Sequence, residues 1–155
     1  MSKEDLTLSI KKLQDSSPTD SRIWYNDWVL KQNKGLKVLD IGKSRYWDYS
    51  IFKDYTTIDT NSDVKPDIIG NAEDYNFDNY DLVLLNGMYE CCDVKKVLKN
   101  LQGKAKEVMC GFVNKNYAPY KADWRYFDED MSIFEGWKVK ERKDFDKYVY
   151  ILLTK

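Results

Sequence analysis

The chain has 155 residues and a formal net charge of −1, with 43% hydrophobic and 33% charged residues. These values predict one soluble globular domain, residues 1–155, and argue against a disordered chain or a nucleic-acid-binding protein, which usually carries a basic face. The chain has no histidine, which excludes Ser-His-Asp and Cys-His catalysis, and its three cysteines form no Cys-x-x-Cys pair, so no metal site is expected.

The sequence gives no sign of a membrane segment. No apolar run is long enough to cross a bilayer, and the first five residues, MSKED, lack the basic and then apolar layout of a signal peptide. We therefore expect a cytoplasmic protein that makes no contact with a membrane.

Two helices are predicted within residues 1–35. Residues 5–14 carry apolar side chains at loose helical spacing, and residues 21–32 follow a break, SSPTD, that has turn and cap chemistry. An Asn-Lys-Gly segment at residues 33–35 then supplies a helix stop.

Residues 36–155 alternate short apolar runs with polar connectors. The run at residues 82–85, LVLL, is apolar throughout, which is typical of a strand buried on both faces of a parallel sheet. The pattern predicts an α/β fold, with a mostly parallel open sheet of about seven strands, helices on both faces and a C-terminal antiparallel hairpin. The expected strands are 36–41, 55–59, 66–70, 80–86, 107–113, 137–141 and 148–153, with a helix at 93–101.

The segment KVLDIG at residues 37–42 is the most informative motif. Its apolar run leads into Asp40, and Gly42 follows two residues later. A second short run ends at Asp59, nineteen positions after Asp40. A strand ending in a carboxylate, a tight turn and a second carboxylate at the next strand end form a pattern that holds nucleosides. Polar residues follow the next two predicted strands as well, at Asn71 and Asn86.

These residues give the chain a resemblance to the class I S-adenosylmethionine-dependent methyltransferases, from about residue 21 to the C-terminus. Residues 38–42, VLDIG, resemble the first motif of the family, and residues 57–59, TID, its acidic second motif. Residues 67–73, DIIGNAE, resemble the adenine-binding segment, and residues 81–86, DLVLLN, the fourth strand. The resemblance implies a Rossmann-like methyltransferase fold that binds S-adenosylmethionine.

The resemblance also assigns roles to the strand-end residues. Asp59 would accept hydrogen bonds from both ribose hydroxyls, although a turn or helix-cap aspartate would look the same in sequence. Asp40 would order the turn and bind the amino group of the methionine part, and Gly42 would let the backbone approach the cofactor. The alternative for both is ordinary turn formation.

Four further positions complete the expected site. Asn71 and the backbone of Ala72 would bind adenine, and Asn86 would lie beside the sulfonium, although each also suits a polar loop or a strand-ending turn. Glu90, just past the fourth strand, is the best-placed general base if the acceptor must lose a proton. A solvated residue in the first turn of a helix is the alternative for Glu90.

The predicted function is methyl transfer from S-adenosylmethionine to a small-molecule acceptor, because the near-neutral charge does not favour nucleic acid. Two departures from the family leave an alternative open. Ser44 and Tyr46 stand where further glycines usually follow the first motif, and Cys91 stands where small members often carry histidine. The alternative is therefore a non-catalytic protein that binds S-adenosylmethionine or its product, or a structural or interaction module.

Overall fold

A computed structural model of the chain describes residues 20–42, 49–86, 93–114 and 127–155. Within these ranges, seven strands form one sheet in the order β3-β2-β1-β4-β5-β7-β6. The neighbouring pairs from β3 to β5 are parallel, whereas β7 runs antiparallel to both β5 and β6. The strands are β1 (Lys37–Ile41), β2 (Asp54–Asp59), β3 (Ile68–Ile69), β4 (Tyr80–Asn86), β5 (Ala105–Val113), β6 (Lys138–Asp144) and β7 (Tyr148–Thr154).

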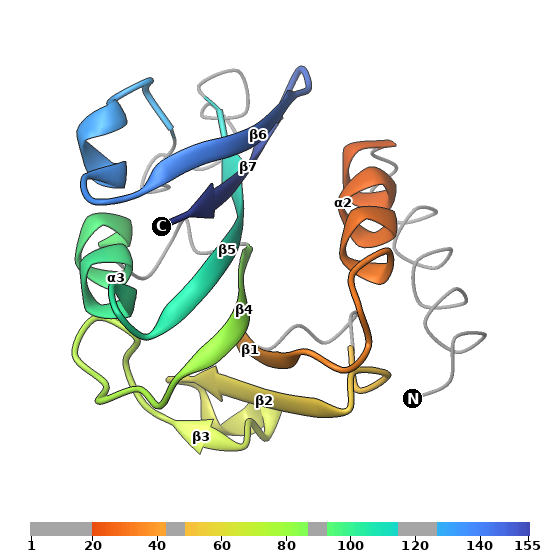
Figure 1. Cartoon of the computed structure of the whole chain (residues 1–155), viewed down its shortest axis with the longest axis vertical. Coiled ribbons are helices and arrows are strands. Elements are labelled where there is room, and N and C mark those ends of the chain that lie inside the picture. The colour runs from red at the N-terminus through yellow and green to blue at the C-terminus, as the bar shows by residue number, and fades with distance from the viewer. Residues whose placement is uncertain (1–19, 43–48, 87–92, 115–126) are drawn as a thin grey trace.

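The two described α-helices cover opposite faces of this sheet, as Figure 1 shows. Helix α2 (Asp20–Leu30) lies over one face, and helix α3 (Val94–Leu101) lies over the other. Short 3₁₀ helices at Ser62–Val64 and Met131–Phe134 complete the regular structure of the described residues. The predicted fold class is confirmed, including helices on both faces and the antiparallel C-terminal hairpin.

Alternation along the central strands builds a separate apolar layer on each face. In β4, Leu82 and Leu84 pack in the layer beneath α2, whereas Val83 and Leu85 pack in the layer beneath α3. This follows from the two-residue period of a strand, in which successive side chains point to opposite faces. The continuous apolar run therefore serves two cores at once.

Local chemistry sets the ends of helix α3. Asp93 caps its N-terminus by accepting a hydrogen bond from the backbone N–H of Lys96. After the last turn, Gly103 adopts a φ of +76°, a conformation that glycine reaches without steric cost.

The predicted boundaries differ from the structure by two or more residues at one helix and three strands. Helix α2 ends at Leu30, two residues before its expected end, and β3 covers only Ile68–Ile69 of the expected residues 66–70. Strand β6 continues to Asp144, three residues beyond the expected end, and β5 begins at Ala105, two residues before the expected start. Every residue of β6 is exposed, so its sequence has no apolar pattern from which its end could be predicted. The end of β6 is set by backbone pairing with β7.

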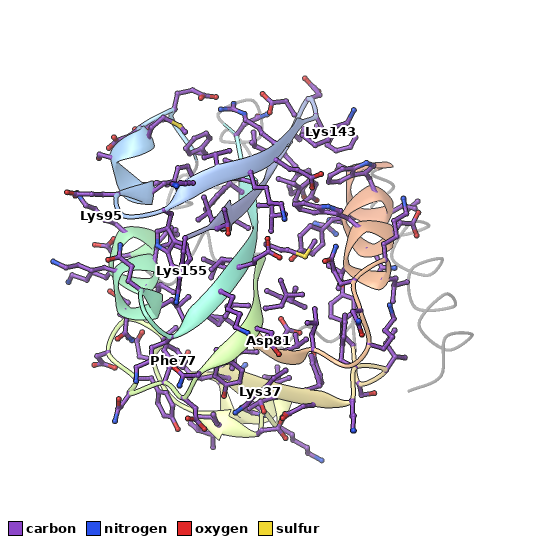
Figure 2. All side chains as sticks on the ribbon, viewed as in Figure 1. Lys37, Phe77, Asp81, Lys95, Lys143 and Lys155 are labelled. Carbon is purple, nitrogen blue, oxygen red and sulfur yellow. The ribbon has the colours of Figure 1, made fainter. Side chains whose placement is uncertain are left out.

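Asp81 joins the starts of three strands. Its carboxylate accepts a hydrogen bond from the backbone N–H of Lys37 at 2.9 Å and pairs with the ammonium group of Lys106 at 3.1 Å. Asp81 and Lys37 lie close together on neighbouring strands in Figure 2. The backbone hydrogen bond, followed by the Lys106 charge, holds the pKa of Asp81 below its ordinary value.

We expect Asp81→Asn to lower the free energy of unfolding by about 1 kcal/mol at pH 7. Because the pKa of Asp81 is lower in the folded than in the unfolded chain, its stabilising contribution is present above the unfolded pKa of about 3.9 and is lost as the pH falls through the folded value. Urea denaturation at pH 7 and at acid pH should show the difference between parent and variant shrinking on acidification.

Asp78→Asn is the matched control for Asp81→Asn. The Asp78 carboxylate lies 3.5 Å from the Lys37 ammonium group, but its side chain is 77% exposed. We expect this change to alter the free energy of unfolding by no more than about 0.5 kcal/mol. Equal losses in the two variants would contradict a specific role for Asp81.

Candidate functional site

The strand register brings three predicted site residues into one row at the carboxyl edge of the sheet. Ile41 pairs with Ile58 on one side and with Leu85 on the other, so the next residues of the three strands are Gly42, Asp59 and Asn86. The row crosses the point between β1 and β4 at which the strand order reverses direction. Open α/β sheets bind ligands at such a switch point.

Gly42 follows β1 with a φ of +83°, and its backbone N–H donates to the carbonyl of Ile58 at 2.9 Å. A side chain would strain the backbone at this φ. The glycine therefore turns the chain at the sheet edge and leaves its own backbone uncovered by any Cβ.

Asp40 is buried among tyrosines on the α2 face of the sheet. The residue is 6% exposed, and its carboxylate accepts a hydrogen bond of 2.5 Å from the hydroxyl group of Tyr55, on β2. Burial is the main cause that raises the pKa of Tyr25 and of Tyr49, and the negative charge of Asp40 raises both further. The carboxylate therefore lies within electrostatic reach of three phenols.

Asp59 lies on the same face of the sheet as Asp40. Asp40 is paired with Thr57, and Asp59 follows two residues later on β2, so alternation turns both carboxylates to one side. One oxygen of Asp59 accepts the backbone N–H of Asn61 at 2.8 Å, and the residue is half-buried. Asp59 therefore has the turn role that the sequence allowed. Among the described contacts, this role uses one of its two carboxylate oxygens.

The segment after β3 is held by α3. Ala72 is 5% exposed, and its carbonyl accepts a hydrogen bond of 3.1 Å from the side-chain amide of Asn100. The same amide donates to the carbonyl of Tyr75 at 2.8 Å, so one side chain of α3 pins both ends of this turn. Asn71 is exposed, and its side-chain oxygen accepts the backbone N–H of Glu73 at 2.9 Å. The adenine-binding roles of Asn71 and Ala72 stay predictions.

The remaining predicted residues lie at or beyond the end of β4. Asn86 is the last residue of that strand and pairs with Gly111 of β5. Glu90, the predicted general base, lies outside the described residues. Its role stays a prediction.

Two residues that fix this edge were not predicted as site residues. Tyr55 holds the Asp40 carboxylate, and Asp67 fastens the start of the β3 region to β2. The carboxylate of Asp67 accepts the backbone N–H of Thr57 at 2.9 Å and its hydroxyl at 3.1 Å. The signal for Tyr55 was its place on the same face of the strand as Thr57 and Asp59, two and four residues later. This spacing becomes informative only once the register with β1 is known.

Two negative findings apply to the part of the chain that the structure describes. No group of three or more histidine, cysteine, aspartate or glutamate side chains there could hold a metal ion. Among the same residues, no helix is long and apolar enough to cross a membrane.

No protein-family model matches the chain, and no curated protein matches its sequence. Solved structures do match. The N-methyltransferase NodS from Bradyrhizobium japonicum WM9 aligns with a TM-score of 0.67 at 11% identity, over 86% of this chain and 95% of that chain. TehB from Haemophilus influenzae gives a TM-score of 0.65 at 13% identity, over 95% of this chain and 67% of that chain.

Magnesium protoporphyrin IX methyltransferase ChlM from Synechocystis PCC 6803, solved with S-adenosylmethionine bound, gives a TM-score of 0.58 at 11% identity, over 98% of this chain and 82% of that chain. At these identities the likeness establishes the fold. The chain has the fold of the class I S-adenosylmethionine-dependent methyltransferases.

We expect Tyr55→Phe to lower the free energy of unfolding by about 2 kcal/mol, because a buried carboxylate loses a charge-assisted hydrogen bond. Tyr25→Phe is the control, since the Tyr25 hydroxyl donates a longer, 3.3 Å hydrogen bond to a neutral carbonyl, that of Met109. Denaturant unfolding of both variants measures the difference. A loss in Tyr55→Phe no larger than that in Tyr25→Phe would contradict the importance of the Asp40 bond.

Proposed function

We propose that this protein binds S-adenosylmethionine at the carboxyl edge of β1, β2 and β4 and transfers its methyl group to a small-molecule acceptor. The observation that carries the proposal is the row of Gly42, Asp59 and Asn86 at the switch point of a methyltransferase sheet. The solved methyltransferases of the same fold support it, including one that contains S-adenosylmethionine.

The residues present fit an adenosyl group. A carboxylate at the end of β2 suits two vicinal ribose hydroxyls, because each of its oxygens accepts more than one hydrogen bond. The local bond from Asn61 to one oxygen of Asp59 fixes the side chain while it leaves further acceptor capacity. The turn at Gly42 presents backbone without a Cβ beside this carboxylate.

When bound, the cofactor supplies an electrophilic methyl group on a sulfonium. The protein then needs chiefly to align an acceptor with that methyl group and to exclude water. In this proposal Asp59 positions the ribose, Asp40 supports the turn after β1 and meets the amino group of the methionine part, and Asn86 lies beside the sulfonium. Asn71 and Ala72 bind the adenine.

The proposed acceptor is a small molecule rather than a nucleic acid. Basic and acidic residues number 25 and 26, so the chain as a whole does not carry the positive charge that attracts phosphate backbones. Methylation of a hydroxyl group on the acceptor would need a base to take its proton, and Glu90 is the proposed base.

We expect Asp59→Asn to weaken the binding of S-adenosylmethionine about ten-fold, because the amide keeps an acceptor for Asn61 but loses the charge that strengthens ribose hydrogen bonds. Isothermal titration of parent and variant measures the ratio. Asp63→Asn, which removes an exposed carboxylate from the neighbouring 3₁₀ helix, is the control and should bind like the parent. If Asp59→Asn also binds like the parent, the site is placed wrongly.

A methyl-transfer assay separates an enzyme from a non-catalytic binder. Parent protein with S-adenosylmethionine labelled in its methyl group should move the label into low-molecular-weight acceptors, and Asp59→Asn should do so more slowly at limiting cofactor. Binding without transfer to any acceptor pool would favour the non-catalytic alternative. Absence of binding would leave an interaction module as the better description.

A further inference from the structure

In the part of the chain that the structure describes, strand β6 has a neighbouring strand on one side only. It is the last strand in the sheet order, beyond β7, and Figure 1 shows it at that end of the sheet. All seven of its residues are exposed, including the apolar Val139 at 41%. The backbone N–H and C=O groups along such an edge can pair with a strand of another molecule.

The hydrogen bonds of the β6–β7 hairpin decide which backbone groups of β6 face outward. Beside the hairpin turn, the N–H of Phe145 donates to a backbone carbonyl of β7 at 2.8 Å. In an antiparallel pair, residues bonded to the neighbouring strand alternate with residues whose backbone groups point away from it. Counted back in twos from Phe145, Lys143 and Glu141 bond to β7. The backbone groups of Arg142 and Asp144 therefore point to the open edge.

A bulge limits the usable length of this edge. The register with β7 shifts between Val139 and Glu141, so pairing is irregular there and regular from Glu141 to Asp144. Bulges and charged side chains are common means by which an edge strand avoids indiscriminate pairing. The open edge of β6 is therefore suited to one short and specific partner strand rather than to extended assembly.

The two outward residues carry opposite charges on the same face of the sheet, because they are two positions apart. The Arg142 guanidinium pairs with the carboxylate of Asp144 at 2.7 Å and with that of Glu129 at 2.5 Å. Together these carboxylates accept four hydrogen bonds from Arg142, which leaves one of its five N–H donors over. The positive and negative charges at this edge are therefore held in fixed places.

We propose that the open edge of β6 pairs with the same edge of a second copy of this chain. The strands run antiparallel, and Arg142 of each copy lies opposite Asp144 of the other. A two-fold axis beside Lys143 produces this register. It places the outward backbone groups of both strands in two bonded pairs, each of which exchanges both N–H···O bonds. The contact closes on itself, as in an isologous dimer.

The charge pattern is the reason for choosing a second copy as the partner. Residues 141–144, ERKD, carry two negative and two positive charges, so two such segments meet without net repulsion. In the proposed register, an opposite-charge pair forms twice, once on each side of the axis. Lys143 lies opposite its own copy, and Glu141, on the same face of each strand, offsets part of this like-charge contact.

The inference does not depend on the proposed function. Strands β5 and β7 separate β6 from the strands that end at the candidate site. Cofactor binding and dimer formation can therefore be measured as separate properties of the same samples.

Sedimentation equilibrium of the parent protein tests the association. We expect a monomer–dimer equilibrium with a Kd between about 1 μM and about 1 mM, the range of a small interface. Asp144→Pro removes an outward N–H that does not bond to β7, so it should shift the protein to the monomer while the hairpin persists. A parent that stays monomeric at about 1 mM would overturn the proposal.

Charge reversal tests the register. Arg142→Asp and Asp144→Arg each place like charges opposite one another, so each variant alone should dimerise at least about ten-fold more weakly than the parent. Mixing the two variants restores opposite charges at both positions and should give a mixed dimer. Asp63→Arg, the same reversal in the 3₁₀ helix between β2 and β3, is the control and should dimerise like the parent. Circular dichroism of each variant checks that it is folded.

Dimerisation that is lost in both reversed variants and returns in their mixture supports the proposal. Equal dimerisation of the parent and both variants, or no recovery in the mixture, would overturn it. Lys143→Thr removes the like-charge contact at the axis and should tighten the dimer about three-fold. Weaker dimerisation of Lys143→Thr would overturn the proposed register. Titration of the same samples with S-adenosylmethionine shows separately whether the proposed function stands.

Discussion

The structure depends on the burial of its central strands from both sides. Val38, Leu39, Val83 and Leu84 are all within the core, so β1 and β4 have no face that water can reach. In such strands a polar side chain must find its partners inside the protein or destabilise the fold. Asp40 meets this condition through the hydroxyl group of Tyr55, which comes from the adjacent strand. Asp59, on the next strand outward and at its end, is half-buried and bonds its own turn instead. The two carboxylates of the motif are therefore held by different means.

Much of the fold could be predicted from the sequence, because each buried strand is a short apolar run and each connector is polar. The prediction for β4, Tyr80–Asn86, agrees with the structure at both ends, since its apolar run is bounded by polar residues. The end of β6 could not be predicted in this way, because Lys143 and Asp144 are exposed and join β7 through backbone pairing. The site residues at strand ends were visible as a motif. Their partners Tyr55 and Asn100 were not, because each depends on a contact between segments distant in sequence.

Asn26 illustrates a further limit of sequence interpretation. Tyr25 and Trp28 of α2 pack in the core, as aromatic residues on one side of a helix usually do. The sequence does not reveal that the asparagine between them is fully buried and unpaired. An unpaired buried amide lowers stability by about 1–3 kcal/mol, which is a sizeable fraction of the total stability of a small domain.

The turn at Asp59 connects an observed structural role with the proposed binding role. The bond from the Asn61 backbone restricts the rotamer of the carboxylate, and the side chain of Asn61 in turn accepts the backbone N–H of Asp63 at the start of the 3₁₀ helix. A ligand that meets a side chain already fixed in this way avoids the entropy loss of ordering it, which amounts to about 0.5–1.5 kcal/mol for a flexible side chain. The turn interpretation and the proposed ribose role of Asp59 are therefore compatible, because the bond that forms the turn also restricts the carboxylate.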